Sequence, residues 1–343
     1  MTFKVLLQPS GRSFDVARDE PVLAAAIRQG VGLPYGCKDG ACGSCKSRLL
    51  EGRVIHGAHQ TKALTPAEED GGYILTCCAT PQTDLVVEAR TVPGAGEFPV
   101  LKMPTRVSAI ARPAPDVAVL RMQLPANLQF RYHAGQYVEF ILRDGTRRSY
   151  SMATAPHNAH GGIELHIRHM PGGKFTDHVF GAMKEKEILR LEGPFGSFFL
   201  REDSTKPIVL LASGTGFAPI KAIIEQLQFK HSEREAVLYW GCRSRADLYL
   251  NEWAQEAAIS MPRLRYVPVL SEPKPEDAWQ GRTGLVHHAV MADLPDLSGW
   301  QVYACGAPVM VESAQRDFVA RCGLPADEFY ADAFTSEADK HGG

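Results

Sequence analysis

Short strand-like runs dominate the first 90 residues of the chain. Phe3–Gln8 and Ser13–Val16 are two such runs, and a Pro-Ser-Gly turn joins them. Pro21–Gly30 starts with proline and ends with glycine, an asymmetry that predicts a helix. Lys46–Leu50 and Asp84–Arg90 add two more strand-like runs. Short strands around a single helix predict a small α+β domain.

The pattern changes twice along the rest of the chain. From about residue 105 to 206, short apolar runs are separated by Pro and Gly, which favours an antiparallel barrel or sandwich. From residue 207 onwards, strand-like and helix-like segments alternate, which predicts a doubly wound parallel sheet. The runs of the middle block are Arg106–Ala111, Val117–Gln123, Tyr137–Leu142, Ile163–Arg168 and Ile188–Glu192. The last block contains strand-like Ile208–Ala212, Ala236–Trp240, Leu264–Leu270 and Gln301–Cys305, and helix-like Ala218–Phe229, Gly284–Met291 and Pro308–Cys322.

Domain boundaries follow from these changes of pattern. Residues 93–99, Pro-Gly-Ala-Gly-Glu-Phe-Pro, have no periodicity and indicate a linker. We therefore expect domains at residues 1–92, 104–206 and 207–343, with the linker at 93–103. A chain of 343 residues is long enough for two or three domains. The expected fold class is multidomain, with an α+β domain, an antiparallel β-barrel and an α/β domain.

Composition excludes several classes of protein. Hydrophobic residues at 45% and charged residues at 22% are typical of a folded globular chain. The net charge of −2, from 37 basic and 39 acidic side chains, offers no electrostatic basis for binding nucleic acid. No run approaches the roughly 18 apolar residues that span a bilayer, and the first residues lack a signal-peptide pattern. We expect a cytoplasmic protein with no membrane span.

The cysteines are unevenly placed, because five of the eight fall between Cys37 and Cys78. Cys37, Cys42 and Cys45 form C-x4-C-x2-C, and 31 residues separate Cys45 from Cys77. This is the plant-type spacing for a [2Fe–2S] cluster, with three thiolates from one tight loop and a fourth from a distant segment. Glycines in the loop permit unusual backbone angles, so amide N–H groups can point at sulfur and help to set the reduction potential.

A structural zinc site is the alternative, since four cysteines also suit zinc. Zinc sites usually contain two C-x2–4-C knuckles, whereas the fourth ligand here has no such partner, so an iron–sulfur cluster is the preferred interpretation. Of the adjacent pair Cys77-Cys78 we assign Cys77 as the ligand. The cysteines left to packing are Cys78, Cys242 and Cys322.

The cysteine loop Gly-Cys-Lys-Asp-Gly-Ala-Cys-Gly-Ser-Cys, residues 36–45, resembles the cluster loop of plant-type ferredoxins and ferredoxin-fused reductases. This resemblance implies a β-grasp fold for the first domain. It also implies that the first two of the four cysteines bind one iron and the last two bind the other.

A second motif, R-x-Y-S, occupies residues 148–151. Arg148 is a fixed cation suited to a pyrophosphate, and Tyr150 offers an aromatic face to an isoalloxazine ring. Ser151 can place a hydroxyl and an amide near the reactive edge of a flavin. Alone, the motif also fits a solvated basic turn beside a core tyrosine. It resembles the FAD-binding signature of the ferredoxin–NADP reductase superfamily.

A glycine pair before a predicted helix supports FAD binding. Residues 166–176 read His-Ile-Arg-His-Met-Pro-Gly-Gly-Lys-Phe-Thr, and an open helix N-terminus is a ready phosphate site. In the superfamily this segment completes the FAD pyrophosphate pocket. For His166 and His169 we favour a plain surface position on a strand. The candidate cofactor contacts of the segment are His166, Arg168, Gly173, Lys174 and Thr176.

A third motif follows the first strand of the α/β block. Residues 211–219, Leu-Ala-Ser-Gly-Thr-Gly-Phe-Ala-Pro, put a glycine-rich turn between a strand and a helix, where backbone amides bind a pyrophosphate. The turn is not G-x-G-x-x-G but resembles the G-T-G-x-A-P turn of the same superfamily, in which the position of Ser213 often holds glycine. The candidate nucleotide contacts are Gly214, Thr215 and Gly216, with Gly241 and Arg243 facing the adenosine ribose.

A later strand ends in Cys305-Gly306-Ala307-Pro308. The resemblance implies that Cys305 lies near the nicotinamide C4, with Gly306 beside it, and assists hydride transfer. A buried small hydrophobic residue is the alternative for Cys305. Arg243 and Arg245 can meet a 2′-phosphate, whereas Asp247 can repel one, so these residues leave NADH and NADPH open. The resemblance to reductases that mostly use NADH implies NADH as the electron donor, with NADPH as the alternative.

The order of the motifs, iron–sulfur, then FAD, then NAD, resembles the one-chain reductases of ring-hydroxylating dioxygenases and multicomponent monooxygenases. It is also similar to the CDP-6-deoxy-3,4-glucoseen reductases of deoxysugar biosynthesis. The resemblance implies hydride transfer from NADH to FAD, followed by single-electron transfer through the [2Fe–2S] centre to a redox partner protein. That partner would be an oxygenase component or a deoxysugar dehydratase component.

The resemblance also implies specific roles. The expected catalytic residues are Tyr150, Ser151 and Cys305, and Phe334 is expected either to cover the flavin or to belong to the core. A free-standing NAD(P)H diaphorase, or flavin or quinone reductase, is the alternative function. A redox-sensing module is a third hypothesis, which the intact motifs argue against. We expect a monomer.

Overall fold

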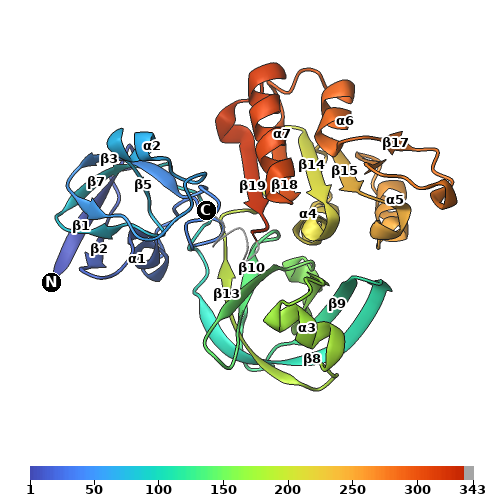
Figure 1. The fold of residues 1–343 in the computed structure, drawn as a ribbon, viewed down its shortest axis with the longest axis horizontal. Coiled ribbons are helices and arrows are strands. Elements are labelled where there is room, and N and C mark those ends of the chain that lie inside the picture. Colours follow the sequence, from blue (N-terminus) through green and yellow to red (C-terminus); the bar gives the residue numbers. More distant parts are fainter. Residues whose placement is uncertain (336–343) are drawn as a thin grey trace. The chain divides into compact units, whose positions relative to one another are not determined.

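A computed structural model of the chain describes residues 1–335 and contains two compact units. The first unit comprises residues 1–100 and 196–198 together with the chain from residue 333, and the second comprises residues 101–195 and 199–332. In Figure 1 the first unit is mostly blue, and the second runs from cyan to red. Among the described residues, no helix has the length and apolar character needed to cross a membrane.

The first unit is built on a five-stranded mixed sheet in the order β2-β1-β7-β3-β5. The central pair β1 and β7 is parallel and the other pairs are antiparallel. Helix α1 buries most of its apolar side chains, as expected. The elements are β1 (Thr2–Gln8), β2 (Ser13–Ala17), α1 (Val22–Arg28), β3 (Lys46–Glu51), β4 (Val54–Ile55), α2 (Pro66–Asp70), β5 (Tyr73–Leu75), β6 (Thr80–Pro81) and β7 (Leu85–Glu88).

The expectation of a single helix in this unit is wrong, because α2 forms a second, short one. Thr65 caps α2 through a hydrogen bond to the Glu68 amide, and the Glu68 side chain accepts a hydrogen bond from the Thr65 amide. This capping box provides hydrogen-bond acceptors for two backbone N–H groups that have no partner within the helix at its N-terminus. It therefore stabilises a single turn that has no buried side chain.

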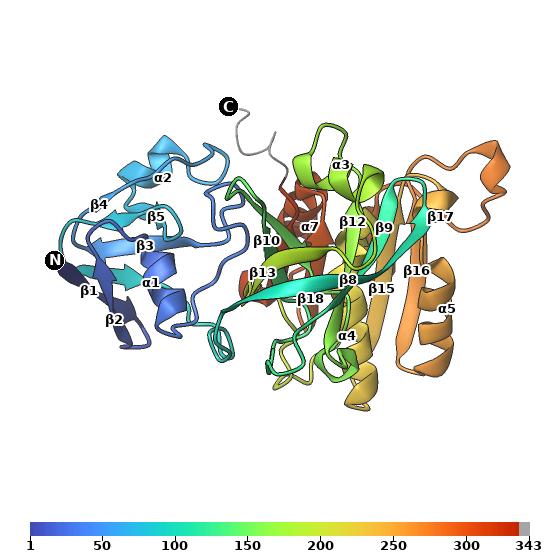
Figure 2. The same ribbon diagram turned by 90° about the horizontal axis from the view of Figure 1, so that it is seen from below.

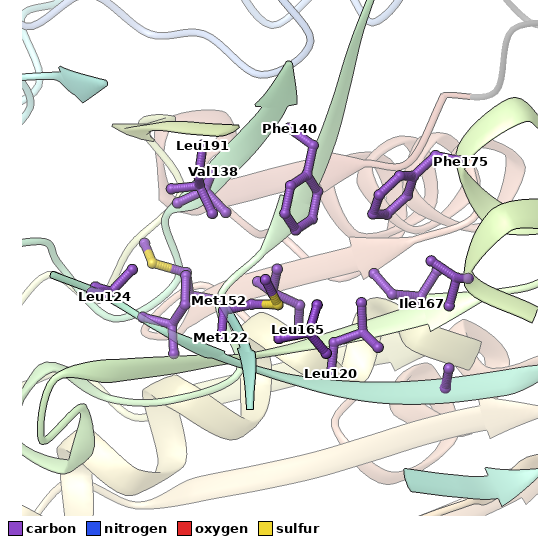
Figure 3. Packing of buried hydrophobic residues seen from close by; sticks show 14 of the residues in the cluster. Leu120, Met122, Leu124, Val138, Phe140, Met152, Leu165, Ile167, Phe175 and Leu191 are labelled. Atoms are coloured by element: carbon purple, nitrogen blue, oxygen red, sulfur yellow. The ribbon is translucent and has the colours of Figure 1, made fainter. Parts of the chain in front are cut away.

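The first half of the second unit is an antiparallel six-stranded sheet in the order β11-β10-β13-β8-β9-β12. A bridge between Met152 and Leu165 connects its two ends, so the sheet closes as a barrel. Figure 3 shows the core, where the rings of Phe140 from β10 and Phe175 from α3 stack with centroids 4.6 Å apart. The elements are β8 (Leu101–Ala114), β9 (Val117–Gln123), β10 (Tyr137–Ile141), β11 (Arg147–Ser151), β12 (Gly162–Arg168), α3 (Lys174–Gly181) and β13 (Ile188–Phe195).

The second half contains a six-stranded sheet in the order β17-β16-β15-β14-β18-β19. The chain moves outward from β14 through β17 and then returns to β18 on the other side of β14, so the topological switch point lies between β14 and β18. Figure 2 shows α5 alongside β16. The elements are β14 (Ile208–Ser213), α4 (Phe217–Phe229), β15 (Ala236–Cys242), α5 (Asn251–Ser260), β16 (Leu264–Leu270), β17 (Arg282–Thr283), α6 (Val286–Asp293), β18 (Gln301–Gly306), α7 (Pro308–Arg321) and β19 (Phe329–Ala333).

Candidate functional site

Four thiols converge in the first unit. Cys37, Cys42 and Cys45 lie in the loop before β3, and Cys77 follows β5. The Sγ atoms of Cys45 and Cys77 lie 3.2 Å apart, and the Cys37 amide donates to Cys42 Sγ at 3.5 Å. Hydrogen bonds from Cys37 lower the pKa of the Cys42 thiol to about 6, and the same contact raises the pKa of Cys37. Two close cysteine pairs are the donor set that a [2Fe–2S] cluster requires.

The loop that holds these thiols depends on backbone angles that only glycine adopts readily. Gly40 and Gly43 have φ of +78° and +75°, a region that residues with a Cβ rarely adopt. A Cβ on Gly40 would lie 2.8 Å from both Cys78 Sγ and His59 Cβ. Cys78 Sγ is 3.5 Å from Cys77 Sγ, so it packs between the loop and a candidate ligand.

The R-x-Y-S motif lies on β11, at one end of the barrel sheet. Tyr150 is half-buried, with its ring centroid 5.4 Å from that of Phe175 and 6.0 Å from that of Phe140. Burial raises its pKa, so the phenol stays neutral. Arg148 donates to the backbone oxygen of Arg147 at 2.7 Å. The motif therefore presents a neutral aromatic ring and a cation from one short strand.

The glycine pair at residues 172 and 173 forms a tight turn before α3. Thr176 Oγ1 donates to Met170 O at 2.8 Å and accepts from Met170 N at 3.2 Å, so this hydroxyl shapes the turn. A Cβ on Gly173 would lie 2.6 Å from Thr176 Oγ1, which explains the glycine. Lys174 forms an ion pair with Asp144 at 2.6 Å. The predicted contacts of Gly173, Lys174 and Thr176 with FAD stay predictions.

His166 corrects our interpretation, because it is buried rather than a surface residue. Its Nδ1 lies 2.8 Å from Tyr249 Oη and its Nε2 lies 3.1 Å from Glu164 Oε1. Both ring nitrogens are therefore engaged within the protein. The outer face of β12 is covered by the nucleotide half of the unit, which a local pattern does not reveal. His169 is half-buried and lies 2.9 Å from Asp177.

Two turns meet at the switch point between β14 and β18. A Cβ on Gly216 would overlap the carbonyl of Cys305, and a Cβ on Gly306 would overlap Ser213 Oγ. Ser213 Oγ accepts a hydrogen bond from the Ala307 amide at 2.9 Å. Ser213 in place of the usual glycine thus ties the two turns together. A crevice at the carboxyl ends of strands at a switch point is where α/β sheets bind ligands.

Arg168 reaches the glycine turn at residues 214–216 from the barrel. Its Cζ lies 3.5 Å from the position that a Cβ on Gly214 would take. Its Nε and Nη2 are buried and make no hydrogen bond within the described part of the chain, although Asp116 Oδ2 lies 3.5 Å from Nε. Buried donors normally have partners, and a guanidinium fits a phosphate as a fork. The phosphate turn and these orphan donors therefore fit a dinucleotide pyrophosphate.

Asp332 on β19 is the residue that the motifs did not indicate. It is 9% exposed, and Ser151 Oγ donates to its Oδ2 at 3.2 Å. Cys305 Sγ lies 3.9 Å from the same oxygen. Burial, with the Asp332 charge, raises the pKa of Cys305 well above its usual range, so the thiol is neutral. An acidic residue inside an apolar terminal strand was the only sequence signal.

The segment that is predicted to face the adenosine ribose begins at the end of β15. A Cβ on Gly241 would lie 2.7 Å from Val286 Cβ. Asp247 Oδ2 accepts hydrogen bonds from the amide and hydroxyl of Ser244 at 3.0 and 3.1 Å, so this carboxylate is turned back into its own loop. Arg243 is exposed and Thr215 is buried.

The remaining sequence candidates divide between the two units. Phe334 is half-buried and belongs to the first unit, and its covering of a flavin stays a prediction. Cys242 and Cys322 are buried, in keeping with packing roles.

Three family models match successive parts of this chain. The 2Fe-2S iron-sulfur cluster binding domain matches residues 5–82, the oxidoreductase FAD-binding domain matches residues 104–200, and the oxidoreductase NAD-binding domain matches residues 210–316. Together with the thiol loop, the barrel motif and the two turns at the switch point, they define an NAD(P)H-dependent oxidoreductase that uses a [2Fe–2S] cluster, FAD and NAD. The expected fold class and cofactors are thereby confirmed.

Curated relatives extend over nearly the whole chain. The CDP-6-deoxy-L-threo-D-glycero-4-hexulose-3-dehydrase reductase of Yersinia pseudotuberculosis serotype I (strain IP32953) is 40% identical, covering 97% of this chain and 99% of that protein. Terephthalate 1,2-dioxygenase reductase component 1 of a Comamonas species is 34% identical, covering 99% of this chain and 100% of that protein. The crystal structure of the Amycolatopsis cytochrome P450 reductase GcoB matches with a TM-score of 0.81 at 34% identity, covering 98% of this chain and 99% of that one. The chain belongs to this family of iron–sulfur flavoprotein electron-transfer reductases.

Proposed function

We propose that this reductase takes hydride from NADH and delivers single electrons to one dedicated partner protein. The observation that carries the proposal is the convergence of Ser151 and Cys305 on Asp332 beside the end of β18. When bound, the nicotinamide supplies hydride, the flavin separates the electron pair, and the cluster carries single electrons. The protein contributes position and electrostatics.

The chain's own residues have distinct roles in this proposal. Asp332 orients the Ser151 hydroxyl, and the neutral Cys305 thiol shapes the nicotinamide subsite. Arg168 and the turn at residues 214–216 bind the dinucleotide pyrophosphate. The residues that hold FAD are Arg148, Tyr150, Gly173, Lys174 and Thr176, and those that hold the cluster are Cys37, Cys42, Cys45 and Cys77. The proposed domains are residues 1–92, 104–206 and 207–343, with a linker at 93–103.

The partner that we favour is a deoxysugar dehydratase component, with an oxygenase component as the other class. The support is similarity, since identity is 40% to the hexulose dehydrase reductase and 34% to the dioxygenase reductase. We further propose that the enzyme is cytoplasmic and monomeric. The lack of disulfides among its eight cysteines is in keeping with a reducing compartment. NADH is the proposed donor, in keeping with the resemblance to NADH-dependent reductases with the same order of motifs.

Anaerobic mixing of the purified holoprotein with NADH tests this function. Flavin absorbance should bleach first and cluster absorbance second, and added acceptor protein should restore both. Purified sugar dehydratase and oxygenase components are compared at equal concentration, with ferricyanide and a quinone as small acceptors. Turnover that is fast with the small acceptors and absent with either protein would instead support a diaphorase. A colourless, zinc-containing protein would contradict the proposal altogether.

A further inference from the structure

A buried charged cluster joins the two halves of the second unit. The barrel contributes Glu164 and His166 from β12, and the nucleotide half contributes Lys221 and Glu225 from α4 together with Tyr249. The side chains of Lys221, Glu164 and Glu225 are 9%, 12% and 11% exposed. We call these five residues the interdomain clamp.

Lys221 is the centre of the clamp. Its Nζ donates to Glu225 Oε1 at 2.6 Å and to the backbone oxygen of Ala153 at 3.0 Å. It also lies 3.3 Å from Glu164 Oε1, and 5.2 Å from the centroid of the Trp253 ring. One ammonium group on α4 thus binds two separate segments of the barrel.

Glu225 and Tyr249 complete the connection. Glu225 Oε2 accepts from the Ala155 amide at 2.8 Å and from Asn158 Nδ2 at 3.2 Å. Tyr249 Oη lies 2.8 Å from Nδ1 of His166. The amide of Ala153 donates to Glu164 O at 2.8 Å, so the barrel segment is held from both sides.

The clamp lies between the two parts of the hydride-transfer site. Ala153 is two residues after Ser151 of the R-x-Y-S motif. Lys221 is one turn along α4 from Phe217, which directly follows the glycine turn at residues 214–216. The Tyr249 ring meets the Trp240 ring edge-on at 5.3 Å, and Trp240 Nε1 donates to Gly214 O at 3.0 Å. A shift of the clamp would therefore move the flavin motif relative to the phosphate turn.

Stability alone is a poor explanation for such a cluster. Burying charges costs desolvation free energy that ion pairs only partly recover, and apolar residues of similar volume often stabilise a protein as well or better. What paired, hydrogen-bonded charges add is a defined geometry. The contacts of His166 and Lys221 outweigh burial and lower the pKa of Glu164 to about 2, so its charge persists at any working pH.

We propose that Lys221 is a positioning residue for hydride transfer. By binding Ala153 O, Glu164 and Glu225 together, it sets the alignment of the Ser151 edge of the flavin site with the nicotinamide subsite beside Cys305. The proposal rests on the hydride transfer described under the proposed function. Lys221 touches neither reacting group, so it acts through the segments that it holds.

The variant Lys221→Met tests this in the holoprotein, because it keeps the length of the side chain and removes the ammonium group. Misplacement by about 1 Å can slow a reaction by roughly a hundredfold. We expect stopped-flow flavin reduction by NADH to slow by about ten- to a hundredfold, with little change in the KM for NADH. The long-wavelength charge-transfer absorbance of the reduced flavin with NAD⁺ should weaken. Electron transfer from dithionite-reduced enzyme to cytochrome c should be unchanged.

Lys230→Met is the matched control. Lys230 is the C-cap residue of the same helix, and its ion pair with Glu202 at 3.2 Å is exposed. This variant should reduce its flavin at the wild-type rate. Tyr249→Phe is a milder second variant that removes only the hydroxyl bonded to His166. It should slow hydride transfer by a few fold in the same direction.

Distinct outcomes separate the two proposals. Wild-type hydride transfer and charge-transfer absorbance in both clamp variants would overturn the positioning role. If Lys221→Met loses FAD, Tyr249→Phe becomes the deciding variant. A wild-type rate of flavin reduction by NADH in Tyr249→Phe would then also overturn the positioning role. If the wild-type holoprotein itself is not reduced by NADH, the proposed function fails, and that result is independent of any variant.

Discussion

Two glycine-rich loops in this molecule each form part of a proposed cofactor site, but the groups that complete each site come from different places in the chain. The loop at residues 36–45 carries three of the four candidate cluster ligands as well as the glycines that shape it. The turn at residues 214–216 offers mainly backbone groups, and the side chains beside Gly214 come from separate strands, Arg168 from β12 and Trp240 from β15. The first loop is therefore a local motif, whereas the second site is assembled by the fold.

The difference predicts how each region responds to mutation. A cluster with four thiolate ligands is lost when one ligand is lost, so effects in the first loop should be all or none. The site at the switch point is formed by several groups from separate strands. Removal of one group should therefore reduce activity with NADH only in part.

Cys42→Ser should have the largest effect. Cys42 is one of the four converging thiols, and without it a [2Fe–2S] cluster lacks a ligand. We expect NADH-dependent cytochrome c reduction to fall to background, while ferricyanide reduction by NADH is largely kept. Cys322→Ala, at a buried cysteine after α7, is the control and should keep both activities. Loss of both activities in Cys42→Ser would mean that the cluster is needed for folding.

Gly216→Ala should come next. The new Cβ would overlap the Cys305 carbonyl, and backbone atoms on both sides leave little room to adjust. Relief of this overlap should shift the turn away from the Cys305 strand, and misplacement by about 1 Å can slow a reaction by roughly a hundredfold. We therefore expect kcat/KM for NADH to fall by roughly ten- to a hundredfold with normal flavin content. Gly299→Ala, which has no heavy atom within 4 Å of its Cβ, should be neutral. A normal kcat/KM in Gly216→Ala would remove this turn from the dinucleotide site.

Arg168→Met distinguishes the two phosphate ligands. The sequence resemblance assigned Arg168 to the FAD segment, whereas the structure puts its guanidinium beside Gly214. Hydrogen bonds to charged groups contribute about 1.5–3 kcal/mol, so the KM for NADH should rise by roughly ten- to a hundredfold while FAD stays bound. Loss of FAD with an unchanged KM would return Arg168 to the flavin.

Asp332→Asn should give a smaller loss. Asparagine can still accept from Ser151 but removes the charge near Cys305. We expect flavin reduction by NADH to slow by a few fold, measured by stopped-flow absorbance. An unchanged rate would show that the carboxylate has no part in the site.

The pH dependence of flavin reduction checks the state of Cys305. Its pKa is raised well above the ordinary value of 9.0 by burial and by Asp332, so the neutral thiol persists below that value. The rate in the wild type should show no thiol titration between pH 7 and 9. A change centred in that range that disappears in Cys305→Ala would contradict the raised pKa.

Cys78→Ala should have the smallest effect. Cys78 packs on Gly40, and Cys45 lies 3.2 Å from Cys77, so Cys77 is the proposed ligand. Iron content and cluster absorbance should match the wild type, whereas Cys77→Ser should lose both. The reverse result would exchange the two assignments.

Most of the fold was predictable because its elements are marked locally. Five of the six barrel strands and the β14–α4 unit fall where alternating runs, Pro and Gly indicate. Strand β11, which carries the R-x-Y-S motif, was not predicted as a strand, and helix α5 (Asn251–Ser260) and strand β19 were also missed. The surface position expected for His166 was wrong, because the cover over β12 comes from residues more than 50 positions away, such as Lys221 and Tyr249.

The sequence by itself determined the cluster loop, the two cofactor motifs and the order of the domains. Each of these depends on residues close together in the chain, whose chemistry and spacing can be recognised without a fold. Only the tertiary structure decided that Asp332 joins Ser151 to Cys305, that Arg168 reaches Gly214, and that a buried lysine connects the two halves of the second unit. These contacts join residues that are far apart in the chain and become neighbours only when separate strands come together in the fold. A local sequence pattern therefore does not reveal them.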